Sequence, residues 1–168
     1  VVRPADANET AAAWKAVLKQ SGPVGLILSR QAIETVTTPD VAAQVDRGAY
    51  VLRDVEDAEA IIIATGSEVG IALKAADMLE ADGIRVRVVS APCLEWFEAQ
   101  PAAYRAAVLP DRIRNVVSVE AGSTIGWHRY ATTTIGVNDF GASGAPDLLY
   151  KQFGVTVEAV VAAVKAAK

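Results

Sequence analysis

The alternation of apolar and polar positions predicts a strand, helix, strand unit in the middle of the chain. Residues 60–64 form a short, isoleucine-rich apolar run that leads into the turn Thr65-Gly66-Ser67. A continuous apolar run of this length beside a glycine is typical of a strand that is buried on both faces. A helical pattern follows over residues 68–82, and residues 84–89 then alternate as a strand does. This unit should form the middle of an α/β sheet.

A second unit of the same kind is expected in the first 30 residues. Val1-Val2 looks like the end of a strand, and Asp6 or Asn8 can cap a helix that ends before Ser21-Gly22-Pro23. Residues 24–28 are apolar again and predict a second buried strand. The segment Ser29-Arg30-Gln31 would then follow the carboxyl end of that strand. This is the edge at which open α/β sheets usually bind ligands.

The rest of the pattern completes an α/β fold. Residues 34–47 are polar and irregular, which predicts a linker and a domain boundary. Strands are expected to start at Tyr50 and at Asn115, and residues 122–146, rich in Gly, Thr and Ser, are expected to form loops. Helical segments are expected at residues 94–97, 104–109, 147–153 and 156–164. The predicted architecture is a mixed, mostly parallel open sheet of about five strands flanked by helices.

Composition narrows the classes of function. The chain has 168 residues, a net charge of -4 and 52% hydrophobic residues, and no apolar run approaches the roughly 20 residues of a membrane helix. The acidic pI, near 5.0, argues against nucleic-acid binding. A single cysteine, Cys93, rules out an internal disulfide and fits the reducing cytoplasm. The chain begins at Val1, in mid-strand and without methionine, which suggests a piece of a larger protein.

Few residues offer chemistry of their own. The chain has one histidine and one cysteine, so it cannot form a histidine dyad or a thiolate metal cluster by itself. It contains neither the Gly-x-Gly-x-x-Gly dinucleotide fingerprint after a strand nor a phosphate-binding loop with Gly-Lys-Ser/Thr. We therefore predict no catalytic, cofactor-binding or metal-binding residue. The turn Thr65-Gly66-Ser67 could hold an anion at the start of a helix, or it could be an ordinary turn with Ser67 as N-cap.

Four side chains are candidates for binding or for a structural role. Arg30 could grip a phosphate in a bidentate manner, or it could pair with Glu34. Glu120 ends a predicted strand, where it could cap a loop, face a partner subunit or accept hydrogen bonds from the glycine-rich turn that follows. His128 lies among aromatic residues and indicates loop packing or an interface rather than a catalytic base. Cys93 is expected to be a buried, inert thiol.

Short motifs follow one another in a fixed order along nearly the whole chain. They are Arg3-Pro4-Ala5-Asp6-Ala7-Asn8-Glu9, Leu28-Ser29-Arg30-Gln31, Gly48-Ala49-Tyr50-Val51-Leu52, Ile63-Ala64-Thr65-Gly66-Ser67-Glu68-Val69, Val88-Val89-Ser90-Ala91-Pro92-Cys93, Val119-Glu120-Ala121-Gly122, Gly126-Trp127, Phe140-Gly141-Ala142-Ser143 and Phe153-Gly154. Together they resemble the C-terminal part of transketolase. Gly144 departs from the family pattern as an extra residue in a loop that usually reads Phe-Gly-Ala-Ser-Ala-Pro, which leaves only the conformation of that loop open.

The resemblance implies part of a cytoplasmic, homodimeric enzyme of the pentose phosphate pathway. Such an enzyme uses thiamine diphosphate and a divalent metal, Mg or Ca, to move a two-carbon ketol unit between sugar phosphates. Residues 1–36 would be the tail of the pyrimidine-binding domain, a strand, helix, strand unit. Residues 37–48 would be a linker, and residues 49–168 would be the C-terminal domain.

The resemblance also assigns roles to individual residues. The arginine of the family's Ser-Arg-Gln motif contacts the substrate phosphate, which implies substrate-binding roles for Arg30 and its neighbour Ser29. The cofactor motif, the catalytic glutamate and the substrate-binding histidines of the family would lie upstream of this chain. The chain alone is therefore expected to be inactive and to bind no cofactor, while contributing scaffold to the dimer.

Two alternatives stay open at the level of sequence. One is another thiamine enzyme with a similar C-terminal domain, either deoxyxylulose-phosphate synthase or the β-subunit of a 2-oxo acid dehydrogenase. Arg3-Pro4 and Ser29-Arg30-Gln31 favour transketolase over these enzymes. The other is a free-standing regulatory or assembly module that binds an anion at Ser67.

Overall fold

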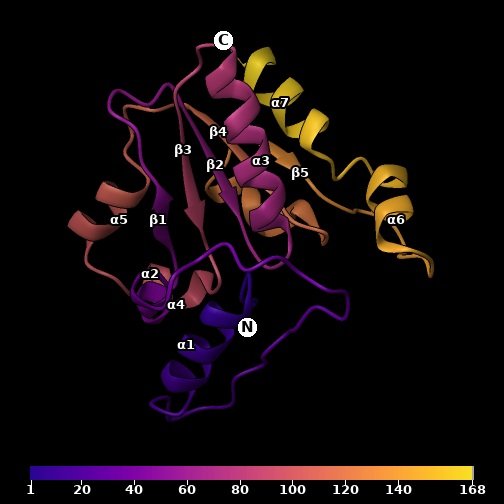
Figure 1. Ribbon diagram of the computed structural model, residues 1–168. Helices are drawn as coiled ribbons and strands as arrows, with labels where there is room; N and C mark the ends of the chain where they lie inside the picture. The colour runs from indigo at the N-terminus through magenta and orange to yellow at the C-terminus, as the bar shows by residue number, and fades with distance from the viewer. Residues whose placement is uncertain (168) are drawn as a thin grey trace.

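A mixed five-stranded sheet forms the centre of the molecule (Figure 1). The computed structural model describes residues 1–167, and its strand order is β1-β3-β2-β4-β5. The strands are β1 (Tyr50–Arg53), β2 (Ala60–Ala64), β3 (Val86–Ser90), β4 (Asn115–Val119) and β5 (Thr133–Ile135). Strand β1 is antiparallel to β3, and every other pairing is parallel. The predicted fold class is therefore confirmed.

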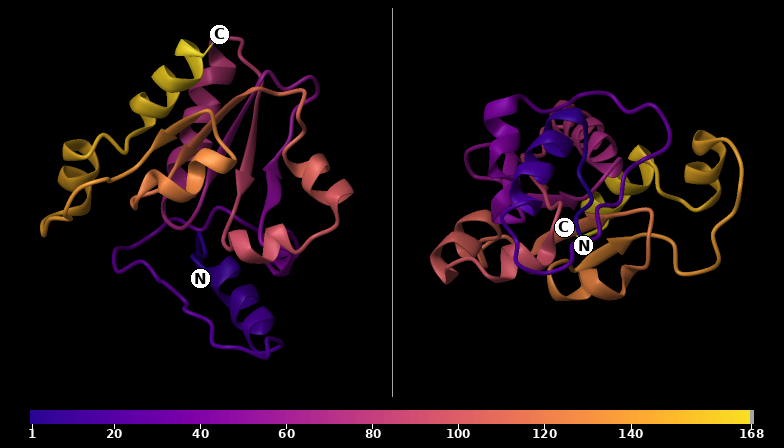
Figure 2. Two further views of the ribbon diagram at one scale, coloured as in Figure 1. Left: turned by 180° about the vertical axis from the view of Figure 1, so that it is seen from behind. Right: turned by 90° about the horizontal axis from the view of Figure 1, so that it is seen from below.

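Helices cover both faces of the sheet (Figure 2). One face is covered by α3 (Glu68–Ala81) and α7 (Val157–Ala166), and the other by α4 (Leu94–Glu98), α5 (Ala102–Val108) and the 3-10 helix η2 (Thr124–Arg129). The remaining helices are α1 (Ala7–Val17), α2 (Pro39–Ala42), the 3-10 helix η1 (Ala43–Arg47) and α6 (Pro146–Gln152). Among residues 1–167, no helix has the length and apolar character needed to cross a membrane.

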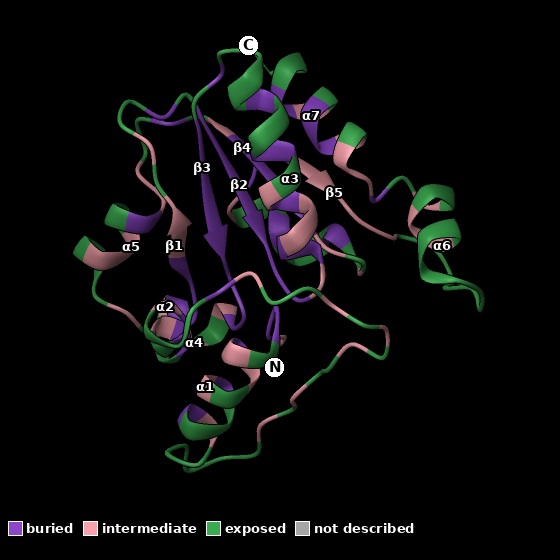
Figure 3. Cartoon of the chain, in the orientation of Figure 1, coloured by how far each residue is buried: buried purple, intermediate pink, exposed green. Residues whose placement is uncertain are grey.

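Strand β2 shows why the central apolar run folds as predicted. Successive side chains of a strand point to opposite faces of the sheet. Ile62 packs with the residues of α3 and α7, whereas Ile61 and Ile63 pack with those of α4 and η2. Every residue of β2 is fully buried, as the uniformly buried colour of the two central strands shows (Figure 3).

The N-terminal unit follows the prediction only in part. Helix α1 forms, and Asp6 caps it by accepting a hydrogen bond of 2.9 Å from the Glu9 N–H. The predicted buried strand at residues 24–28 is wrong. Only Leu26 pairs, in an isolated parallel bridge with Val2, and Ile27 and Leu28 are 52% and 53% exposed. Val24 and Leu26 pack in a cluster with Ala13 of α1. Within the described residues no second strand lies beside this segment, so its apolar character alone does not build a strand.

Strand β5 lies inside the stretch predicted as loop. It has the sequence Thr-Thr-Ile, is half-buried, and pairs in parallel with β4 from Val117 to Val119. Three residues are too few to show an apolar periodicity. The edge of β4, rather than the local sequence, therefore selects this segment as a strand.

A buried carboxylate joins α1 to the sheet. Glu9 is 0% exposed and accepts hydrogen bonds from the Tyr50 hydroxyl at 2.5 Å, the Ser90 hydroxyl at 2.6 Å and the Ala5 N–H at 2.7 Å. Burial raises the pKa of Glu9 above its usual value of 4.5, and this effect outweighs the three hydrogen bonds, which act to lower the pKa. The nearby carboxylate of Asp6 acts in the same direction.

We predict that Glu9 makes the chain less stable as the pH rises. An acid whose pKa is higher in the folded state stabilises that state below pH 4.5, and this contribution is lost as the pH rises through the folded-state value. Urea unfolding at a series of pH values should show the wild-type chain losing stability relative to a Glu9→Gln variant above pH 4.5. Curves of the two proteins that stay parallel across this range would contradict the prediction.

Candidate functional site

Polar side chains gather at the carboxyl ends of β2 and β4. The turn Thr65–Ser67 follows β2, Glu120 follows β4, and Arg3 lies against both. Parallel strands end at the same edge of a sheet, where ligands of open α/β proteins usually bind.

Arg3 joins the two carboxylates at this edge. Its guanidinium donates to Glu120 and, at 3.3 Å, to Glu68, which is fully buried at the start of α3. The backbone N–H of Ala121 also donates to Glu68, at 3.0 Å, and the Trp127 indole N–H donates to Glu120, at 2.6 Å. The sequence pattern marked Arg3 as part of a family motif but not as a site residue. Glu120 was expected to cap a loop, to face a partner subunit or to accept from the following turn, whereas its carboxylate accepts from Arg3 and Trp127.

The turn Thr65–Ser67 is occupied by the chain itself. The Gly66 N–H and the Thr65 hydroxyl both donate to the carbonyl oxygen of Arg3, at 3.1 and 3.2 Å. Ser67 occupies the N-cap position of α3, as predicted, but it has helical backbone angles and its hydroxyl donates to Glu68 at 2.7 Å. The expected capping hydrogen bond from its side chain is therefore not made. An anion at this turn would meet the buried Glu68 carboxylate, which disfavours the anion-binding hypothesis.

Tyr150, from α6, connects this cluster to the segment that carries Arg30. Its hydroxyl donates to Glu68 at 2.7 Å, lies 2.9 Å from the Ser67 hydroxyl, and accepts from the Gln31 side-chain amide at 3.2 Å. Burial, with the adjacent charge of Glu68, raises the pKa of Tyr150 to about 12. The phenol therefore keeps its proton at neutral pH and can act as donor and acceptor at once.

Arg30 lines a cavity next to Tyr150. The cavity has a volume of about 640 Å³ and lies between the segment of Arg30 and the loop that precedes α6. Its lining includes Arg30, Gln31, Gly141, Ser143, Pro146 and Tyr150. The Arg30 side chain is exposed, and within residues 1–167 it has no hydrogen bond or ion pair. It is a guanidinium free to bind an anion.

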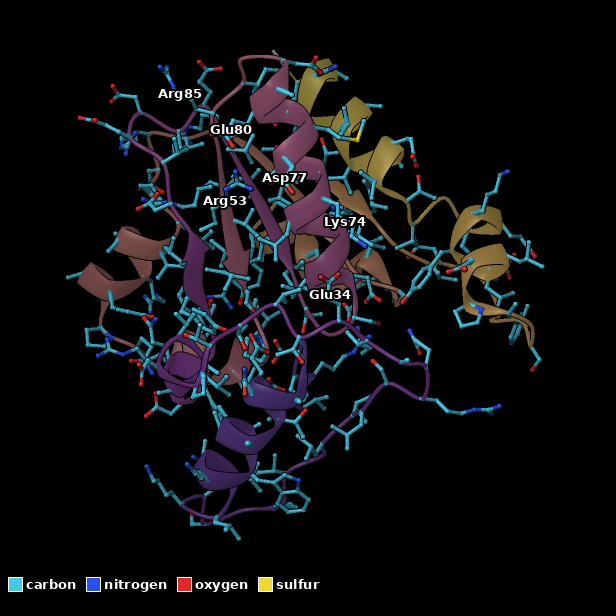
Figure 4. All side chains as sticks on the ribbon, in the orientation of Figure 1. Glu34, Arg53, Lys74, Asp77, Glu80 and Arg85 are labelled. Carbon is cyan, nitrogen blue, oxygen red and sulfur yellow. The ribbon has the colours of Figure 1, made fainter. Side chains whose placement is uncertain are left out.

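The structure places two neighbours of Arg30 away from its guanidinium. Glu34 does not pair with Arg30. Its carboxylate oxygen Oε2 lies 4.0 Å from Nζ of Lys74 in α3 instead (Figure 4). Ser29 lines a separate cavity of about 250 Å³ beside α1 and is absent from the lining of the larger one. Arg30 thus shares its cavity with Gln31 and Tyr150, and the substrate-binding role of Ser29 stays a prediction.

The remaining candidates have structural surroundings. Cys93 is buried, and burial raises the pKa of its thiol to about 11, as expected for an inert cysteine. His128 is exposed in η2, next to the buried Trp127. No group of three or more His, Cys, Asp and Glu residues in the described part of the chain could hold a metal ion.

A family model decides where this fold belongs. The model described as "Transketolase-like TK C-terminal domain" matches residues 48–156, which include the whole sheet. The chain belongs to the transketolase family. The predicted resemblance is confirmed.

Individual transketolases match almost the whole chain. The transketolase of Mycobacterium bovis is 48% identical over 99% of this chain and 25% of its own length, so the chain spans about a quarter of such relatives. The structure of the Leishmania mexicana transketolase superposes with a TM-score of 0.91 at 45% identity, over 98% of this chain and 24% of that one.

Two further structures bear on ligands and assembly. The Pichia stipitis transketolase, solved as a complex with sedoheptulose 7-phosphate, has a TM-score of 0.88 at 39% identity and covers 98% of this chain and 24% of its own. A split-gene transketolase, described as an inactive β4 tetramer, has a TM-score of 0.79 at 32% identity, over 99% of this chain and 56% of that one. Sugar-phosphate complexes and oligomers thus occur among the transketolases that share this fold.

Proposed function

We propose that this chain acts as the C-terminal part of a transketolase, which transfers a two-carbon ketol unit between sugar phosphates. The observation that carries the proposal is the unpaired guanidinium of Arg30, which lines a cavity of about 640 Å³. Arginine binds phosphate oxygens through parallel N–H donors and keeps its charge at any physiological pH. The ligand in the Pichia stipitis transketolase complex, sedoheptulose 7-phosphate, carries a phosphate group of this kind.

The same proposal divides the chain into functional parts. Residues 1–36 are the tail of the pyrimidine-binding domain, residues 37–48 are a linker, and residues 49–168 are the C-terminal domain of a cytoplasmic homodimer. The start of the family match at residue 48 supports this division. Helix α1, which Glu9 and Asp6 tie to the sheet and the linker, supports a fixed placement of the tail.

Thiamine diphosphate and its divalent metal are assigned to other parts of the enzyme. When bound, the coenzyme supplies the carbanion chemistry of ketol transfer. The described residues do not fit it, because they contain no carboxylate, histidine or cysteine cluster that could hold the metal. We predict that the chain alone gives no turnover above background in a coupled transketolase assay. Activity of the isolated chain would contradict the prediction.

Arg30 should matter only for phosphorylated substrates. In a complete transketolase that carries this chain, Arg30→Ala is expected to raise KM for phosphorylated substrates roughly 10- to 100-fold, the equivalent of one charge-assisted contact of about 1.5–3 kcal/mol. Arg112→Ala is the matched control, since Arg112 is also exposed and unpaired among the described residues but does not line the cavity. Equal effects of Arg30→Ala on phosphorylated and unphosphorylated substrates would remove the phosphate role.

A further inference from the structure

We infer that Tyr150 is a positioning residue that holds the segment carrying Arg30 beside the cavity. The inference rests on the proposed function, in which Arg30 contacts the substrate phosphate. Tyr150 belongs to α6, far along the chain from Arg30, and its hydroxyl accepts a hydrogen bond from the Gln31 side chain at 3.2 Å. Gln31 is the next residue after Arg30, so holding Gln31 restricts where Arg30 can lie.

The segment around Arg30 has hardly any other support. The chain is fixed on one side by Ile27, whose N–H donates to Val2, and on the other by Val36, whose N–H donates to Asp6. Between these points, within the described structure, the only hydrogen bond or ion pair of residues 28–35 besides the 4.0 Å contact of Glu34 with Lys74 is the Gln31–Tyr150 hydrogen bond. Residues 18–38 as a whole run as an extended connection from α1 back to α2 (Figure 1).

Tyr150 is itself held firmly. Its hydroxyl donates at 2.7 Å to Glu68, which is fully buried and also accepts from Arg3 and from the Ala121 N–H. The hydrogen bond from Gln31 thus ends on a group connected to the carboxyl ends of β2 and β4. Ordering a backbone segment costs conformational entropy at each residue, so a hydrogen bond in the middle of the segment raises the fraction of time that Arg30 lies beside the cavity.

The first test uses this chain alone and measures motion. The variant Tyr150→Phe keeps the ring and removes the hydroxyl that Gln31 binds. Backbone 15N relaxation should give order parameters near 0.85 for residues 29–33 of the wild-type chain and values falling toward 0.6 in the variant. Tyr130→Phe is the matched control, because the Tyr130 hydroxyl also donates to a carboxylate, that of Glu98 at 2.7 Å, on the opposite face of the sheet. Unchanged order parameters in Tyr150→Phe would overturn the inference.

The second test uses a complete transketolase that carries this chain. Tyr150→Phe should raise KM for phosphorylated substrates roughly 3- to 10-fold, the equivalent of one neutral hydrogen bond, with kcat and the KM of unphosphorylated substrates unchanged. Gln31→Leu should give the same change, and the double variant should add nothing, because both remove one interaction. A Tyr150→Phe enzyme with the kinetics of the Tyr130→Phe control would overturn the positioning role.

The two proposals fail in different ways. If Arg30→Ala shows no selectivity for phosphorylated substrates, the phosphate role of Arg30 is wrong, although the relaxation measurement can still show that Tyr150 anchors the segment. If Arg30→Ala is selective and Tyr150→Phe changes neither KM nor the order parameters, Arg30 binds phosphate without help from Tyr150.

Discussion

Replacing Arg3 with methionine is expected to lower the free energy of unfolding of this chain by about 3–5 kcal/mol. The variant would leave the carboxylate of Glu68 fully buried without its cation, and Glu120 would lose the same partner. Such a loss is a large share of the roughly 5–15 kcal/mol that stabilises a typical domain. Urea unfolding of the two proteins at one pH measures the difference.

Arg53 provides the matched control for this experiment. It also bridges two carboxylates, Asp77 and Glu80 of α3, but these are 68% and 63% exposed (Figure 4). Arg53→Met should therefore cost no more than about 1 kcal/mol. If Arg3→Met costs as little as the control, the buried charge of Glu68 does not depend on Arg3. Adding Glu68→Met to Arg3→Met should restore part of the loss, because it removes the uncompensated charge.

Gly48→Ala is expected to lower the free energy of unfolding by about 2–5 kcal/mol, through backbone strain and overpacking together. Gly48 has φ of +83°, a conformation that L residues rarely adopt. An added Cβ would lie 2.2 Å from the Phe97 nitrogen and 2.3 Å from the Cys93 oxygen. Both neighbours are backbone atoms in the packed turn before and within α4, so they cannot move aside as a flexible side chain could.

Gly83→Ala separates the two causes. Gly83 has a similar φ of +76°, but no atom lies within 4 Å of an added Cβ. The control should thus lose only the strain contribution of about 1–2 kcal/mol. Urea unfolding of both variants measures the difference. Equal losses would mean that the turn at Gly48 relaxes to accommodate the methyl group.

Local patterns were sufficient to predict the central elements. The run Ala60–Ala64 predicts β2 because five consecutive apolar residues, rich in isoleucine and close to a glycine, are typical of a strand buried on both faces, and the structure buries all of them. Asp6 predicts the start of α1 because its short carboxylate can reach a free N–H within three residues. Both features depend on neighbours close in sequence.

Local patterns gave wrong predictions where strand pairing depends on residues that are distant in the sequence. Residues 24–28 have the composition of a buried strand but pair only through Leu26, and β5 forms although its three residues show no strand pattern. A strand needs a free edge to pair with, and the local sequence does not say where that edge will be.

Short motifs and apolar spacing are local properties, so the family, the central strands and Arg30 as the candidate phosphate ligand follow from the amino-acid order alone. How the site edge is built depends on contacts between residues that are distant in the chain. Arg3 and Glu120 are 117 positions apart, and Gln31 and Tyr150 are 119 apart. Arg3 meets Glu120 at the edge where the parallel strands end, and Tyr150 meets Gln31 while it is hydrogen-bonded to Glu68 at the same edge. Both juxtapositions are properties of the folded chain.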